Sequence, residues 1–130
     1  MHKKDESYRF RFIYDPYDVK EKYDISDMYH KYMNDSKAII EINGRIYYRA
    51  LCIVRTNIRG RALIATLDSR LNMRVQDIIV DENGREYIVN GFEMYRFAGG
   101  IPEWFSNIFT VMLVGDIDNT GKYFTKKTAE

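Results

Sequence analysis

The sequence predicts a mainly β protein: a small closed antiparallel β-barrel of about six to eight strands with a short N-terminal helical segment. The apolar runs 77–80 and 86–89 are joined across Asn83-Gly84, a dipeptide that accepts the positive φ of tight hairpin turns. Asn43-Gly44 joins a second such pair, 38–42 and 45–51. Short apolar runs then recur at close spacing, which favours a barrel or a sandwich over alternating strands and helices.

Residues 1–36 are expected to form a strand and helix extension packed on a barrel of residues 37–130. Residues 8–14 alternate aromatic and basic side chains, the period of a half-buried strand. Asp15-Pro16 suits the start of a helix and Asp24 the start of a second one, so one broken helix or two short helices are expected up to Met33. Their Tyr and Met side chains are expected to seal the core, with partner docking as the alternative.

Further strands are expected at 61–67, 92–97, 108–114 and 123–125. The run 108–114 is the most continuously apolar, so both of its faces are predicted to be covered. Between the strands expected at 92–97 and 108–114, Gly99-Gly100 opens a loop that carries Trp104 and Phe105.

The composition is that of one globular domain with a net charge of +1, which excludes a global field that attracts nucleic acid or anionic membranes. Cys52 is the only cysteine and lies in an apolar run, so a buried, inert thiol and no disulfide are expected. The amino terminus lacks the apolar segment of a signal peptide, and no apolar run approaches the roughly 20 residues of a membrane span. A cytoplasmic protein without membrane association is therefore expected.

Residues 58–66, IRGRALIAT, resemble a strand-turn-strand segment of the second, β-barrel domain of translational GTPases such as elongation factor Tu. Asp77-Ile78-Ile79-Val80 stands where that family has a Gly-Asp and an apolar strand. Residues 91–96, GFEMYR, are similar to a later segment of that barrel, and the resemblance covers about residues 47–115.

Three positions depart from this family pattern, because Ala62, Leu67 and Gln76 stand where the family has glycine. No GxxxxGK[ST] phosphate loop is present, so the resemblance implies a barrel without a GTPase domain. An OB-like barrel or a phage-type head-tail joining barrel would give a similar pattern. The resemblance implies a fold and, as a second possibility, an association with RNA or the ribosome.

No catalytic or metal-ligand constellation is found, so neither an enzyme nor a cofactor is expected. His2 and His30 are the only histidines, and neither they nor Cys52 lies in a spacing typical of metal ligands or nucleophilic sites. The carboxylates Asp81 and Glu82 fall in a predicted turn, where solvated acids are expected.

Every basic residue between Lys37 and Lys122 is an arginine, a side chain suited to gripping phosphate and stacking on rings. Arg45, Tyr47 and Arg49 share one face of the predicted strand 45–51, and such a basic and aromatic face could bind single-stranded nucleic acid. The simpler interpretation is that these arginines pair with Glu41, Glu86 and Glu93 across the sheet. The candidate nucleic-acid-binding residues are Arg45, Tyr47, Arg49, Arg55, Arg59 and Arg61.

The loop after Gly99-Gly100 supplies a candidate protein-binding surface, since exposed Trp and Arg side chains often anchor partners. Its candidate residues are Trp104, Phe105, Tyr95 and Arg96, although Trp104 folding back as a lid on the barrel is the simpler interpretation. The sequence therefore favours a small non-enzymatic binding module that engages an unknown protein partner or forms a homo-oligomer. The alternative is an RNA- or ribosome-associated barrel with an Arg-rich face. A continuous Arg face would favour nucleic acid, and arginines dispersed among acids would favour protein.

Overall fold

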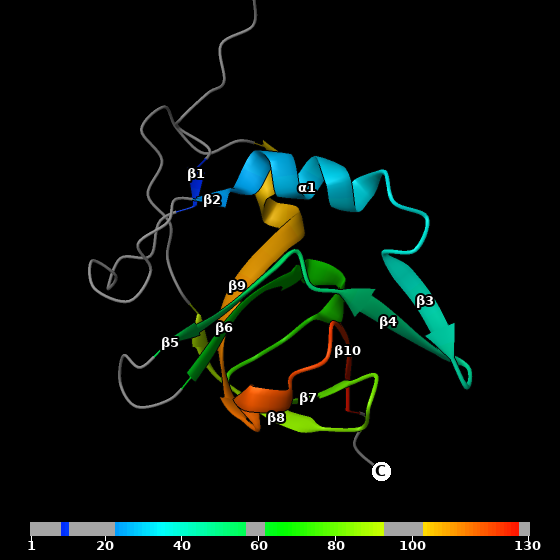
Figure 1. The fold of residues 1–130 in the computed structure, drawn as a ribbon, viewed down its shortest axis with the longest axis vertical. Helices are drawn as coiled ribbons and strands as arrows, with labels where there is room; N and C mark the ends of the chain where they lie inside the picture. Colours follow the sequence, from blue (N-terminus) through cyan, green and yellow to red (C-terminus); the bar gives the residue numbers. More distant parts are fainter. Residues whose placement is uncertain (1–8, 11–22, 57–61, 93–102, 128–130) are drawn as a thin grey trace, which may run out of the picture.

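The computed structural model describes residues 9–10, 23–56, 62–92 and 103–127 (Figure 1). Strands dominate it. Two short strands, β1 (Arg9–Phe10) and β2 (Tyr23–Asp24), pair with each other beside helix α1 (Ile25–Met33). The main sheet has eight strands in the order β3-β4-β10-β7-β8-β9-β6-β5, and all of its neighbours pair antiparallel. Its strands are β3 (Ile39–Ile42), β4 (Arg45–Arg49), β5 (Cys52–Thr56), β6 (Ala62–Asp68), β7 (Ile78–Asp81), β8 (Glu86–Phe92), β9 (Ile108–Gly115) and β10 (Tyr123–Lys126).

The predicted mainly β class is confirmed. The strand order has two ends, β3 and β5, which do not pair with each other in the described residues, so the sheet is not a closed ring of paired strands. In the described ranges, three short 3-10 turns lie between its strands: η2 (Ser69–Leu71), η3 (Glu103–Asn107) and η4 (Ile117–Asn119).

Both predicted tight hairpins are present. Asn43 and Gly44 have φ values of 52° and 81°, so both central residues of the β3–β4 turn adopt the left-handed conformation. Gly84, with φ of 84°, closes the turn between β7 and β8. These turns form where predicted because their conformational requirement is local to the dipeptide.

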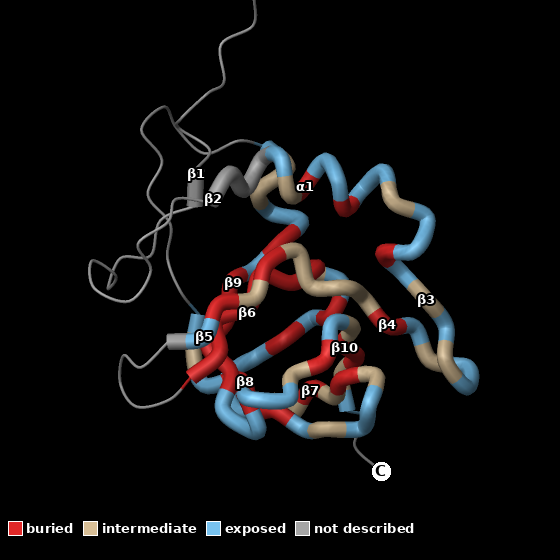
Figure 2. Tube along the Cα trace, viewed as in Figure 1, coloured by how far each residue is buried: buried red, intermediate tan, exposed pale blue. Residues whose placement is uncertain are grey.

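The main core lies on the inner side of the sheet, where β6, β8 and β9 contribute most of the buried side chains (Figure 2). Its largest fully buried residues include Tyr87, Phe124, Leu63, Leu67 and Leu113. Strand β9 was predicted to be covered on both faces, which holds only for its middle. Phe109 and Val114, near its two ends, are 40% and 43% exposed.

Helix α1 covers the outer side of β5 and β6. It begins directly after Asp24, as the second predicted helix start requires, and Asp27 lies in its first turn. Tyr29 and Tyr32 point toward the sheet and are buried, and Tyr29 joins a second apolar cluster with Cys52 and residues of β5, β6 and β9. The first predicted start, Asp15-Pro16, lies outside the described residues.

Candidate functional site

A pocket of about 220 Å³ opens between α1 and the end of β6. Residues of α1, β6, η2 and η3 line it, and most of them are aromatic, charged or amide side chains. The lining residues are Tyr29, Tyr32, Met33, Asp68, Ser69, Arg70 and Asn107.

The buried carboxylate of Asp68 organises this pocket. It accepts hydrogen bonds from Arg70 Nε at 3.0 Å and Arg70 Nη2 at 2.7 Å, and its Oδ2 also accepts from the Tyr32 hydroxyl at 2.8 Å. It caps η2 by accepting the Arg70 backbone N–H at 2.9 Å. The Arg70 guanidinium also lies over the Tyr48 ring, 5.3 Å from its centroid.

The pKa values of Asp68, Tyr32 and Arg70 are shifted away from neutral pH, which does not favour acid–base catalysis by this cluster. Burial alone would raise the pKa of Asp68, but the hydrogen bonds from Arg70 and Tyr32 outweigh it and hold that pKa below its usual value. Burial and the bond to Asp68 raise the pKa of Tyr32, which keeps its phenol neutral. None of these three groups is poised to exchange a proton near neutral pH. The hydrogen bond between Tyr32 and Asp68 instead joins α1 to the end of β6.

Sequence reasoning missed Asp68 and Arg70 as an organised pair. The available signal was an Asp that follows an apolar strand and precedes Ser, a typical capping position. The contribution of Tyr32 could not be read from the sequence, because 36 residues separate it from Asp68.

The predicted arginine surface has a different environment from the one expected. Arg45 Nη2 donates to the Lys126 carbonyl at 3.1 Å, and Arg55 Nε donates to the Ile117 carbonyl at 2.7 Å. Arg49 forms an ion pair with Asp35, not with the predicted glutamates. The arginines on β4 and β5 thus support the packing of neighbouring segments.

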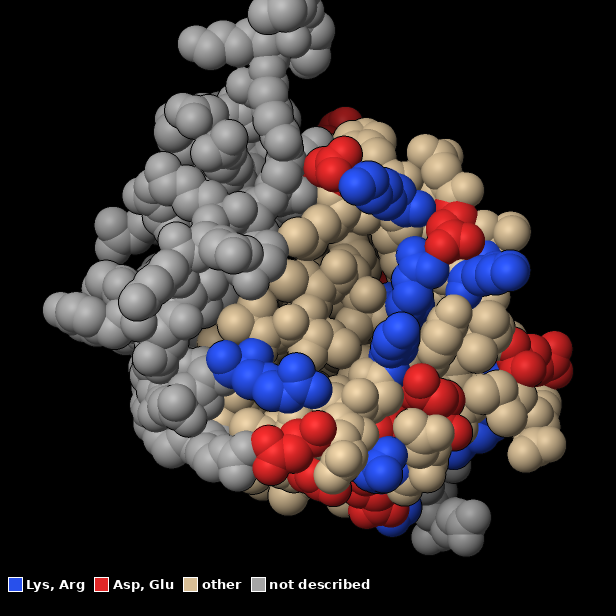
Figure 3. Space-filling view, in the orientation of Figure 1, with Lys and Arg blue, Asp and Glu red and all other residues tan. Residues whose placement is uncertain are grey.

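Tyr47 corrects the prediction of a base-stacking face on β4. It is only 9% exposed, because that face of the strand turns toward the interior at Tyr47. Figure 3 shows Lys and Arg side chains interspersed with Asp and Glu on the face in view rather than gathered into one patch. Arg59 and Arg61 lie outside the described residues.

Trp104 and Phe105 lie in η3 and are half-buried. The Trp104 ring stacks on the Tyr29 ring with centroids 4.6 Å apart, and both Trp104 and Phe105 pack against the second apolar cluster. Asn107 Nδ2 donates to the Tyr29 hydroxyl at 2.9 Å. The turn therefore folds back onto α1 and onto residues of β5, β6 and β9, in agreement with the simpler interpretation that Trp104 is not an exposed anchor. Tyr95 and Arg96 lie outside the described residues.

The prediction of solvated acids at Asp81 is wrong, because this side chain is fully buried. Its Oδ1 accepts the backbone N–H groups of Asn83 and Arg85, and its Oδ2 accepts from the Tyr87 hydroxyl and the Gly121 N–H, all within 3.0 Å. One carboxylate thus joins the β7–β8 turn to the turn before β10. It is a structural group with every oxygen engaged.

The described residues contain no group of three or more His, Cys, Asp or Glu side chains able to hold a metal ion. None of the helices in the described ranges is long and apolar enough to span a membrane. Cys52 is buried, and that burial raises its pKa to about 11, as an inert thiol requires.

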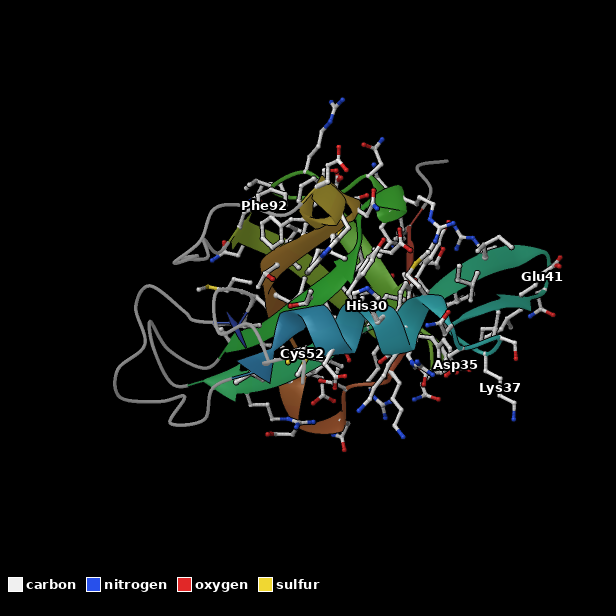
Figure 4. All side chains as sticks on the ribbon, turned by 90° about the horizontal axis from the view of Figure 1, so that it is seen from above. His30, Asp35, Lys37, Glu41, Cys52 and Phe92 are labelled. Atoms are coloured by element: carbon white, nitrogen blue, oxygen red, sulfur yellow. The ribbon has the colours of Figure 1, made fainter. Side chains whose placement is uncertain are left out.

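The outer edge of β3 is the candidate interaction surface. Strand β3 ends the sheet order, and the β3–β4 hairpin projects from the body of the fold (Figure 1). Viewed from above, Glu41 lies toward the tip of the β3–β4 hairpin, whereas Asp35 and Lys37 lie near the base of the hairpin (Figure 4). Ile39 and Ile46 are 37% and 45% exposed on the face that Glu41 shares. Sequence reasoning found both strands but not this edge, because strand order depends on pairing with distant β10.

Comparison of the chain with protein-family models, with curated proteins and with solved structures finds no match. The resemblance to the barrel of translational GTPases therefore stays a prediction.

Proposed function

We propose that this chain is a non-enzymatic protein-binding module that accepts a β-strand from another polypeptide along the outer edge of β3. The observation that carries the proposal is an apolar edge strand, Ile39-Ile40-Glu41-Ile42, with a partner strand on one side only among the described residues. Such an edge offers a row of backbone donors and acceptors to an extended segment.

The hairpin geometry identifies the backbone groups that point outward. Ile42 and Arg45 flank a two-residue turn, so they exchange hydrogen bonds with each other, and alternate residues follow the same pattern. The bond from the Arg49 N–H to the Ala38 carbonyl, 2.8 Å long, fits this alternation. Ile39 and Glu41 therefore direct their N–H and C=O groups away from β4.

Strand β3 carries no lysine, proline or register shift that would hinder pairing at its outer edge. Natural edge strands commonly carry lysine, proline or a bulge that discourages a second strand. Within β3 the only charged residue is Glu41, and three isoleucines supply strong β propensity. The register with β4 is continuous over all four residue pairs.

A protein partner is favoured over nucleic acid by the charges. Three of the six candidate nucleic-acid-binding residues, Arg45, Arg49 and Arg55, are engaged within the fold, and Tyr47 is buried. Acidic side chains are interspersed among the basic ones in Figure 3, which suits protein association better than phosphate binding.

The fold that we propose behind this function is a closed barrel of the translation-factor type. Its support is the junction of β4 and β5, which are consecutive in the chain. The Ala50 N–H donates to the Lys122 carbonyl beside β10, and the next N–H, that of Leu51, donates to the Thr66 carbonyl of β6. One bent segment thus bonds to both flanks. Slow deuterium exchange of both amides is expected, and rapid exchange of either one would argue against closure.

Peptides selected from a displayed random library test the strand-binding proposal. A bound peptide is expected to slow deuterium exchange at the Ile39 and Glu41 amides. Glu41→Pro removes an outward N–H without touching the ladder to β4, so it should weaken binding by about tenfold or more.

Glu41→Thr is the matched control, because it removes the same charge but keeps the N–H. It is expected to bind the selected peptides within about threefold of the unsubstituted protein. Equal binding by the proline and threonine variants, or exchange protection confined to other strands, would refute the proposal.

A further inference from the structure

We infer that the strand added to β3 is β3 of a second copy of the chain, paired antiparallel about a two-fold axis at Ile40. This inference rests on the proposed function and names its partner. A two-fold arrangement requires one surface to complement itself, and an antiparallel edge strand can do so.

The outward backbone groups select the pairing register. In the register that sets Ile39 opposite Glu41 of the second copy, both residues of each chain exchange N–H···O=C bonds, which makes four bonds in all. Every outward group of β3 then has a partner. Ile40 faces Ile40 of the second copy as a non-hydrogen-bonded pair on the axis.

The two neighbouring symmetric registers are less favourable. Moving the axis to Glu41 would set two like charges directly opposite each other. Moving it to Ile39 would require the Lys37 backbone to pair with Glu41, but both Lys37 groups are occupied. Its N–H donates to Asp35 Oδ1 at 2.9 Å, and its carbonyl accepts from the Tyr123 hydroxyl at 2.9 Å.

The side chains agree with the selected register. Ile39, Glu41 and Ile46 lie on one face, and the first and last of these are exposed apolar groups. Pairing sets the aliphatic stem of Glu41 between Ile46 of its own chain and Ile39 of the second copy. Exposed Lys37 of the second copy is then a diagonal neighbour of the Glu41 carboxylate, within reach of a long side chain. The two-fold axis repeats this opposite-charge contact.

A four-residue strand pair buries little surface, so the dimer is expected to be weak and to exchange rapidly. In sedimentation velocity, the weight-average sedimentation coefficient should rise between about 10 µM and 1 mM protein. The rise reports the conversion of monomer to dimer. The rise should be lost in Glu41→Pro and retained in Glu41→Thr, shifted to higher protein concentration because the contact with Lys37 of the second copy is lost.

Engineered cysteines test the register and trap a weak dimer. The two Ile40 residues are expected about 4.5 Å apart between Cα atoms, within disulfide reach, so Ile40→Cys should cross-link under mild oxidation. Ile42→Cys is the matched control, since its two copies are separated by about 14 Å along the strands. The unsubstituted chain, which carries only buried Cys52, should stay uncross-linked.

The outcomes separate this inference from the proposed function. Cross-linking of Ile40→Cys alone supports the dimer, whereas equal cross-linking of Ile42→Cys would overturn the register. A chain that stays monomeric and uncross-linked at about 1 mM would overturn the second copy as the partner. If selected peptides still protect Ile39 and Glu41 in that case, strand binding stands and only the dimer falls. If neither is seen, both proposals fall.

Discussion

Replacing Asp81 by Asn is expected to destabilise the protein by about 2–4 kcal/mol, because the buried carboxylate accepts bonds that an amide cannot. Each oxygen accepts two hydrogen bonds, and the amide keeps only one oxygen. If the nitrogen replaces Oδ2, the Tyr87 hydroxyl can rotate to accept from it. The Gly121 N–H then faces another donor in a site without solvent access.

The magnitude follows from these losses. One buried N–H without an acceptor costs about 1–3 kcal/mol, and converting bonds to a charged oxygen into neutral ones costs about 1 kcal/mol more. Such a loss is a large share of the roughly 5–15 kcal/mol that stabilises a domain. Urea unfolding followed by circular dichroism measures it by linear extrapolation.

Two variants calibrate the result. Tyr87→Phe removes one of the four bonds and keeps the ring edge against Phe124, so a cost of about 1 kcal/mol is expected. Asp116→Asn changes an exposed carboxylate and should fall within about 0.5 kcal/mol of the unsubstituted protein. If Asp81→Asn costs no more than Asp116→Asn, the carboxylate does not hold the two turns together and the reasoning is refuted.

Three further predictions concern other groups. A Cβ on Gly121 would lie 2.1 Å from Glu82 Oε1. Gly121→Ala should therefore displace that carboxylate from the Lys122 N–H and lower the free energy of unfolding in urea by about 1–2 kcal/mol. The loss should be smaller when Glu82 is already replaced by Ala, and additive losses would contradict this explanation. Burial and the bond to Asp81 raise the pKa of Tyr87 from 10.0 to about 12. The folded state thus holds this proton more tightly, so stability is full below about pH 10 and declines toward about pH 12. Tyr87→Phe should reduce that decline in urea midpoints, and an unchanged pH profile would exclude this cause. Finally, Cys52 should react with a thiol reagent at pH 8 only after unfolding, and rapid reaction of the native protein would contradict its burial.

The elements that depend on neighbours in the sequence were predictable. Asn43-Gly44 and the turn at Gly84 require positive φ whatever surrounds them, so their hairpins formed as expected. The helix start at Asp24 is likewise local. Asp81 misled the prediction because a turn position usually means solvent, whereas here the side chain is buried and accepts a hydrogen bond from the Gly121 N–H, 40 residues away.

Residue type alone could not give the role of the arginines. The same pattern of Arg45 and Arg49 on alternate positions of a strand fits a binding face or an internal brace. Their partners, Lys126 and Asp35, lie on other elements, so the choice required tertiary contacts. The hydrogen bond between Tyr32 and Asp68 could not be predicted from the sequence either, because it joins residues that are distant in the chain.

By itself, the sequence determined the mainly β class, both tight turns and the apolar run that forms β3, because turn chemistry and β propensity act over a few residues. Only the tertiary structure decided that β3 ends the sheet, that Asp81 is buried and that Trp104 stacks on Tyr29. Each of these depends on which distant segments pair, and strand order is set by the total of long-range packing and hydrogen bonding.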